Sequence, residues 1–289
     1  MRIRYWALVA LLSGSVMAAP DPHAGHGMRE WTAYPLLQRK MSKDMQMQSP
    51  PLLSARNLQA GRFDAWASNG TAVPNLPVTL GGAELRALPK VGNYYWATAR
   101  EETPEKVVVA STAYYFSNPG PAPRAMLLQQ KNELEIIPQP LPREHSSYRA
   151  NEDWKFLLRF NGKPLTGQAI KLQTANGSQD EFVSDTQGVV TVHFPDDFTP
   201  DAAQPSGEAH RHGPRRADFV LATEYAADGR QYVTAFNYGY GPDAYSTRNL
   251  LWGGGFVMLG MLLAVPLLRR KKTVGQSQSG NGKAGQGAE

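Results

Sequence analysis

The chain has 289 residues, no cysteine and a formal net charge of +5. The absence of cysteine excludes disulfide bonds and thiolate metal sites, so any soft metal ligand must be histidine or methionine. Arg2, Arg4 and the basic run 269–272 supply six positive charges at the two ends of the chain. The part between them is therefore close to neutral, which argues against a nucleic-acid partner.

The first eighteen residues have the pattern of a signal peptide. Arg2 and Arg4 precede an apolar run over residues 6–12, and small residues follow at Val16 and Ala18. We expect cleavage after Ala18, because both small-residue positions before the cut are then filled. The alternative is an uncleaved N-terminal anchor, but the apolar run is too short for the roughly 30 Å of hydrocarbon in a membrane.

Residues 19–55 are predicted to form a flexible arm that carries histidine and methionine. His23, His26 and Met28 lie within six residues of one another. Imidazole suits nickel, copper and zinc, and thioether sulfur favours copper(I), so the arm is a candidate site for Ni(II), Co(II) or Cu. The alternative is a solvated arm whose methionines pack on the folded part of the chain as ordinary apolar side chains.

Residues 56–130 are predicted to form a first small β domain. Short apolar runs alternate with turn residues such as Asn69-Gly70, a pattern typical of strands. The aromatic triplets at 94–96 and 114–116 are expected to pack in the core, because alternate residues of a strand point to opposite faces and about half of the rings are then buried. The alternative is an aromatic platform for a carbohydrate. The predicted strands lie near residues 62–68, 78–88, 94–99, 106–116 and 125–129.

Residues 131–248 are predicted to form a second β domain. Turns are expected at Asn161-Gly162, at residues 184–188 and at Asp228-Gly229. Short strands at this spacing predict an immunoglobulin-like (Ig-like) β-sandwich that lacks the cysteine pair of antibody domains. The expected fold class is therefore all-β, with two small Ig-like sandwiches. The predicted strands of this domain lie near residues 134–137, 154–160, 168–173, 189–194, 219–225 and 232–240.

A polar loop in this domain carries a second group of candidate metal ligands. His210 and His212 are next-but-one neighbours, and Glu208 precedes them. In an extended loop both imidazoles can face one metal ion, with the carboxylate as a third ligand. The alternative is a solvated loop. His193 lies within a predicted strand, where a histidine is more often a hydrogen-bonded sheet residue than a metal ligand.

Three segments of the second domain resemble a known family: LEIIPQP (134–140), FNGKPLTGQAIKL (160–172) and SDTQGVVTV (184–192). Over residues 131–240 the chain resembles the exported family known as the periplasmic component of nickel and cobalt uptake transporters of the energy-coupling-factor type. It is also similar there to carboxypeptidase-regulatory-like and bacterial Ig-like domains. The resemblance implies an accessory subunit of a metal transporter. The family carries Gly-His in its first domain, where this chain has Gly61-Arg62.

Residues 250–268 are predicted to form one transmembrane helix. The segment is uncharged and apolar, and its length suits a helix that spans a bilayer. The basic run 269–272 follows at once and, by the positive-inside rule, predicts a cytoplasmic tail over 269–289. A single-pass protein of the cytoplasmic (inner) membrane, with its bulk in the periplasm, is expected. The alternatives are a buried core helix and a processed sorting tail.

The sequence contains no Gly-x-Ser-x-Gly elbow, His-Glu-x-x-His pair or phosphate-binding glycine loop, so we expect no enzymatic activity. The adjacent carboxylates Glu101-Glu102 and Asp196-Asp197 are predicted to be solvated loop charges. The first functional hypothesis is a membrane-anchored accessory protein that presents nickel or cobalt to a metal-transporter complex. The alternatives are an Ig-like structural or interaction module of the cell envelope without metal binding, and periplasmic copper handling.

Overall fold

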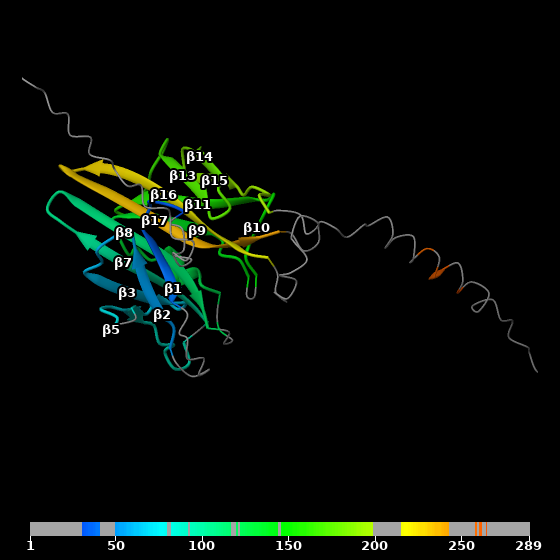
Figure 1. Cartoon of the computed structure of the whole chain (residues 1–289), viewed down its shortest axis with the longest axis horizontal. Coiled ribbons are helices and arrows are strands. Elements are labelled where there is room, and N and C mark those ends of the chain that lie inside the picture. The colour runs from blue at the N-terminus through cyan, green and yellow to red at the C-terminus, as the bar shows by residue number, and fades with distance from the viewer. Residues whose placement is uncertain are drawn as a thin grey trace, which may run out of the picture. The chain divides into compact units, whose positions relative to one another are not determined.

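The described part of the protein, a computed structural model, is built of β-strands and one short helix, which confirms the all-β prediction (Figure 1). The chain divides into two compact units, Met1–Gly241 and Pro242–Glu289. All of the described strands belong to the first unit. The structure describes residues 31–40, 50–79, 82–91, 93–116, 120, 122–143, 146–198 and 215–242, together with 258, 260, 261 and 264.

The strands form three sheets. The N-terminal sheet has the order β1 (Leu36–Lys40), β2 (Leu52–Arg56), β6 (Gly82–Glu84), β5 (Val78–Thr79). The central sheet has nine strands: β14 (Gln179–Val183), β13 (Ala169–Thr174), β16 (Ala217–Ala227), β17 (Arg230–Gly241), β8 (Lys106–Tyr115), β7 (Tyr94–Glu102), β3 (Arg62–Ala67) and β4 (Ala72–Val73), with β10 (Tyr148–Arg149) beside β17. In the C-terminal sheet, β11 (Asp153–Phe160) pairs with β9 (Leu134–Gln139), β12 (Lys163–Pro164) and β15 (Val189–His193).

The central sheet is covered on both faces, because its strands bury both sets of alternate side chains. On β3, Ala65 packs in a core with Leu37 and Leu53 of the N-terminal sheet. Its neighbour Trp66 packs in the opposite core with Phe156 of the C-terminal sheet. The aromatic residues at 94–96 are all buried for the same reason, so their predicted core position is confirmed and extends to both faces.

The central sheet also crosses the expected boundary near residue 131. Strand β8 from the first predicted domain pairs in parallel with β17 from the second, over Lys106–Ser111 and Gln231–Phe236. In Figure 1 the orange strand β17 lies between the yellow strand β16 and β8. The boundary predicted between residues 56–130 and 131–248 therefore falls inside one compact unit, since β8 gains its second neighbour only from the C-terminal part of the chain.

The turns predicted in the second half are present. Asn161 and Gly162 have positive φ angles of 48° and 76°, and Asp228 and Gly229 have 52° and 73°, which suits two-residue hairpins. Before β15, the Asp185 Oδ1 atom accepts hydrogen bonds from the main-chain N–H groups of Gln187 at 2.8 Å and Val189 at 2.9 Å. These local bonds explain why residues 184–188 make a tight turn.

Two local predictions were wrong. The strand expected at 125–129 is the helix α1 (Arg124–Leu128), since alanine, methionine and leucine favour a helix after Pro123. The arm expected over 19–55 contains the strands β1 and β2, and their leucines bury against the central sheet. The sequence LLQRK has too short an apolar run to show this, but Leu37 is only 1% exposed.

Most of the second unit lies outside the described residues, as do the predicted signal peptide 1–18 and the tail 269–289. Within the expected span 250–268, the described positions 258, 260, 261 and 264 are helical. In the part of the chain that the structure describes, no helix is both long and apolar enough to traverse a bilayer.

Candidate functional site

The predicted metal ligands fall outside the described residues. This holds for His23, His26 and Met28 of the arm, and for Glu208, His210 and His212 of the polar loop. In the described ranges, no three or more histidine and carboxylate side chains gather in a way that would hold a metal ion. His193, on β15, is placed as expected for a sheet residue, with its Nδ1 atom 2.7 Å from Oδ1 of Asp153 on β11.

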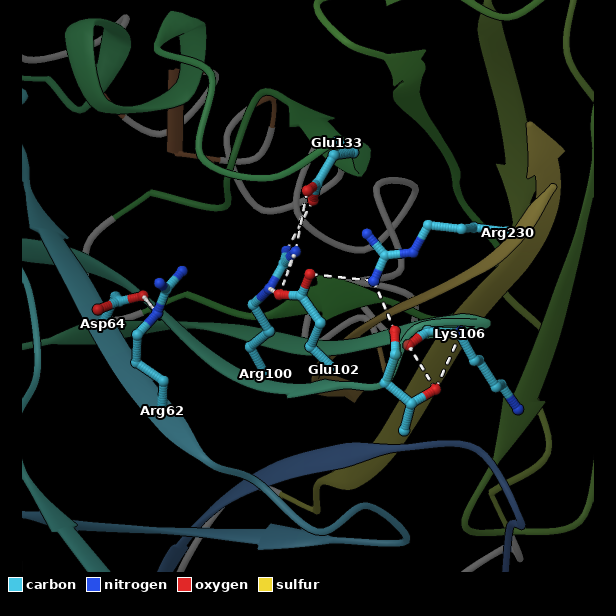
Figure 2. Close-up of polar contacts among 8 residues, drawn as sticks. Arg62, Asp64, Arg100, Glu102, Lys106, Glu133 and Arg230 are labelled. Carbon is cyan, nitrogen blue, oxygen red and sulfur yellow. Dashed lines mark hydrogen bonds and ion pairs between the residues drawn. The ribbon is translucent and has the colours of Figure 1, made fainter. Parts of the chain in front are cut away.

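A network of charged side chains lies where the two halves of the first unit meet (Figure 2). We call Arg100, Glu102, Glu133 and Arg230 the charged seam. The Nη1 and Nη2 atoms of Arg100 donate to the two carboxylate oxygens of Glu133 at 2.6 and 2.9 Å, and its Nε donates to Glu102 at 2.9 Å. A planar guanidinium suits this two-pronged contact, which fixes both distance and orientation.

The seam extends from β7 to β17 through Glu102. The Nη2 atom of Arg230, the first residue of β17, donates to Glu102 at 3.0 Å and to the carbonyl oxygen of Thr103 at 2.6 Å. Figure 2 shows Glu102 between the guanidinium groups of Arg100 and Arg230. The seam therefore ties the hairpin of β7 and β8, the segment before β9 and the hairpin of β16 and β17 to one another.

The ion pairs shift the pKa values of the carboxyl groups in the seam. Hydrogen bonds from Arg100 hold the pKa of Glu133 and the pKa of Glu102 below the ordinary value, and Arg230 adds to the effect on Glu102. The Glu133 carboxylate in turn raises the pKa of Arg100. Arg100, Glu102 and Glu133 are consequently charged at neutral pH, and each is directed at another member of the seam.

An open cavity of about 540 Å³ lies against the seam. Lys131 lines it, with its Nζ atom 2.8 Å from the carbonyl oxygen of Gln129 and 5.3 Å from the centre of the Trp96 ring. Burial lowers the pKa of Lys131 to about 8. Arg62 also lines the cavity and pairs with Asp64 at 2.7 Å.

A second ion pair lies deeper behind the seam. The Nε atom of Arg159 on β11 donates to Glu135 on β9 at 2.7 Å, and both side chains are less than 10% exposed. The Nη atoms of Arg159 donate to the carbonyl oxygens of Leu128 and Gln129 at 3.0 and 2.8 Å. One guanidinium thus satisfies a buried carboxylate and the C-terminal end of α1, where carbonyl groups lack helical partners.

Replacing Arg100 by methionine is expected to reduce the loss of unfolding free energy that acidification causes. Carboxyl groups whose pKa is lowered in the folded state contribute stability above their unfolded pKa, about 4.3 for glutamate, and this contribution is lost as pH falls through the folded pKa. Urea unfolding of the full chain at about pH 7 and about pH 3 measures the difference. An equal loss of unfolding free energy on acidification in R100M and in the parent protein would contradict the prediction. Lys171→Met is the control, because Lys171 is an exposed cation outside the seam.

The sequence contains a partial signal for the seam. Glu101-Glu102 was expected to be a pair of solvated loop charges, but β7 extends through both residues. They point to opposite faces, as predicted for a strand: Glu101 accepts from the main-chain N–H of Gln59 at 2.6 Å, and Glu102 joins the seam. The spacing Arg100-x-Glu102 places both charges on one face of a strand, but Glu133 and Arg230 are brought there only by the fold.

No known protein-family model and no curated protein matches the chain. One similar solved structure belongs to a study of how a 1.5-MDa bacterial ice-binding adhesin is retained at a host cell surface. The similarity covers 73% of this chain and 66% of that chain, at 13% sequence identity and a TM-score of 0.24. This chain thus spans just under two thirds of that structure.

Proposed function

We propose that this protein is a non-enzymatic accessory protein of the cell envelope. Its first unit, Met1–Gly241, which holds the described strands, is the β unit and serves as a rigid interaction module for a partner protein. The proposal rests on the joint between the two halves of this unit, which are the parts before and after residue 131. A continuous sheet crosses it at β8 and β17, and the charged seam closes it. A stiff unit presents its surfaces in a fixed relative geometry, which lowers the entropic cost of binding.

The electrostatics of the seam suit a structural role. A general acid or base works best when its pKa lies near the operating pH. The pKa values of Glu102 and Glu133 are instead moved further below neutrality by Arg100. Both carboxylates are held by guanidinium groups of neighbouring elements, which stabilises the joint.

The proposal includes the finer architecture and the location. The first unit is proposed to derive from two Ig-like sandwiches that share the central sheet. The signal peptide 1–18 would export the chain, and residues 250–268 would anchor it as a single helix in the inner membrane, with the β unit in the periplasm. The motivation is the pattern of charges around the two apolar ends of the sequence.

A second candidate function is presentation of nickel or cobalt to an uptake transporter. It is favoured by the spacing of His23, His26 and Met28, and by the resemblance over residues 131–240. His210, His212 and Glu208 would form a further group of ligands, and copper handling is the variant that the thioether of Met28 favours.

Photo-crosslinking in cells tests the interaction module. A photoreactive residue is placed in the full-length protein at exposed positions spread over its surface, such as Arg56, Lys155 and Lys171, one at a time. We expect a crosslinked product of one discrete mass from a contiguous subset of positions, because a rigid module docks through one face. The absence of a product at every exposed position tested would contradict this function.

Titration of the same protein with Ni(II), Co(II) and Cu tests the second candidate. Binding tighter than about 100 µM that is abolished by His23→Ala and His26→Ala would favour metal presentation. Binding that survives both substitutions, or is weaker than this, would count against the arm as a metal site.

A further inference from the structure

The central sheet divides at one end, between β8 and β17. The two strands are register partners only as far as Ser111 and Phe236, although β8 continues to Tyr115 and β17 to Gly241. Each strand keeps its other neighbour: β7 pairs with β8, and β16 pairs with β17. We call residues 112–114 of β8 and 237–239 of β17 the strand fork.

Side chains and a short strand close the two ends of the fork. At its base, the Thr112 hydroxyl donates to the carbonyl oxygen of Asn237 at 2.8 Å. At its mouth, β10 pairs with β17 at Tyr240 and Gly241. Between these points lies a groove of about 730 Å³, whose remaining wall is formed by residues 37–40 of β1 and by β2.

Strand β1 turns its outer edge toward the fork. The Asn237 side chain accepts from the main-chain N–H of Leu37 at 2.9 Å and donates to its carbonyl oxygen at 3.1 Å. In a strand, the main-chain N–H and C=O groups of every second residue point to the same side. The main-chain groups of Arg39 therefore face away from β2, as those of Leu37 do. The groove is thus bordered by strand edges, which are the surfaces that accept an added strand.

The charge on the groove is mainly positive. Arg39, Lys40 and Arg56 line it, all three are exposed, and no carboxylate of the described chain lies within ion-pair distance of them. The Arg39 guanidinium lies 5.8 Å from the centre of the Tyr114 ring. Asp218 is the one acidic residue among the described residues that line the groove.

A fourth cation lies close by. Burial raises the pKa of Tyr238, and the nearby Arg216 opposes that rise. Tyr238 lines the groove, and Arg216 is exposed. The positive charge favours a negatively charged ligand, the strand edges favour an extended one, and the tyrosine rings favour one that is partly apolar.

We infer that the strand fork binds an extended, acidic segment of a partner protein. Main-chain groups of that segment would bond to the strand edges, and its carboxylates would pair with Arg39, Lys40 and Arg56 on the face of the sheet where Tyr114 packs. Its alternate apolar side chains would point to the opposite face, where Tyr238 packs. The inference rests on the proposed interaction module and names the chemistry of its partner. A protein segment fits better than an anionic polysaccharide or a lipid headgroup, because only a polypeptide matches the repeating donors and acceptors of a strand edge.

The test measures binding of fluorescein-labelled decapeptides to the full-length protein by fluorescence anisotropy. The probes are alternating Glu-Val, alternating Lys-Val, and Glu-Val with N-methyl groups at alternate residues. We expect Glu-Val to bind, Lys-Val not to bind, and N-methylation to weaken binding by about tenfold or more, because it removes main-chain donors. The double variant Arg39→Glu, Arg56→Glu should weaken binding of Glu-Val by at least about tenfold.

The matched control is Lys155→Glu with Lys171→Glu, which reverses two exposed charges away from the fork and should change the affinity less than about twofold. Arg39→Gln with Arg56→Gln is the second fork variant, used if the reversed charges impair folding as judged by thermal unfolding. Glu-Val binding that ignores both fork variants, or equal binding of Lys-Val, would overturn the inference.

Two further arms separate the anionic ligands. A heparin oligosaccharide or phosphatidylglycerol vesicles that bind through Arg39 and Arg56, while Glu-Val does not bind, would also overturn the inference. In that case crosslinked products from the photoreactive positions would leave the interaction module standing. Glu-Val binding at the fork without any crosslinked product in cells would instead count against the module and leave the groove chemistry intact.

Discussion

Replacing Arg159 by methionine is expected to lower the free energy of unfolding by about 3–5 kcal/mol. The substitution removes the ion-pair partner of the buried Glu135 carboxylate, which keeps the main-chain N–H of Lys131 at 3.0 Å, and it removes the donors to the carbonyl oxygens of Leu128 and Gln129. Removing one member of a buried pair is costly because the remaining charge has lost its hydration without compensation. Urea unfolding of the full chain, followed by circular dichroism, measures the loss.

The double variant Arg159→Met, Glu135→Leu separates the buried charge from other effects. Once both charges are absent, at least about half of the lost stability should return, since apolar pairs often replace buried ion pairs without net cost. Arg149→Met is the matched control: its pair with Glu152 is 41% and 37% exposed, so the expected loss is below about 1 kcal/mol. Equal losses in R149M and R159M would refute the role assigned to burial.

Replacing Phe236 by alanine is expected to cost about 3–5 kcal/mol. Phe236 is fully buried on β17, and its ring stacks on that of Trp96 on β7, with centroids 5.2 Å apart and planes at 6°. The two rings come from the two halves that the sequence assigns to separate domains. Urea unfolding should therefore show one cooperative transition in the parent protein, and one cooperative transition with its midpoint at a lower urea concentration in F236A.

A double-mutant cycle with Trp96→Ala measures the coupling across the joint. We expect an interaction energy of about 0.5–1.5 kcal/mol for the stacked pair. Leu128→Ala serves as control, because Leu128 is 75% exposed and its removal should change stability by less than about 0.5 kcal/mol. Two separate transitions, with only one of them shifted by F236A, would show that the halves unfold independently.

Local features of this fold could be predicted from the sequence because they depend on neighbouring residues. Asn161-Gly162 and Asp228-Gly229 indicate hairpins through their backbone preferences, and the strands at 154–160 and 232–240 are the apolar and aromatic runs beside these turns. The observed strands Asp153–Phe160 and Arg230–Gly241 extend those ranges by one to three residues. The all-β class follows from the same signals.

Long-range features could not be predicted in this way. Nothing near Ser111 in the sequence indicates that β8 pairs with a strand more than 100 residues later, yet the Ser111 hydroxyl donates to the carbonyl oxygen of Ala235. The charged seam and the strand fork both result from that pairing. The helix α1 was missed because five residues are too few to distinguish helical from strand periodicity.

The parallel pairing of β8 with β17 also sets the order in which the molecule can assemble. Chain growth delivers β8 long before β17, so an early intermediate presents an open β8 edge that has only β7 beside it. Closing a loop of that length is slow and entropically costly, and open edges invite wrong partners in the meantime. The arrival of β17 therefore completes the central sheet and covers that edge.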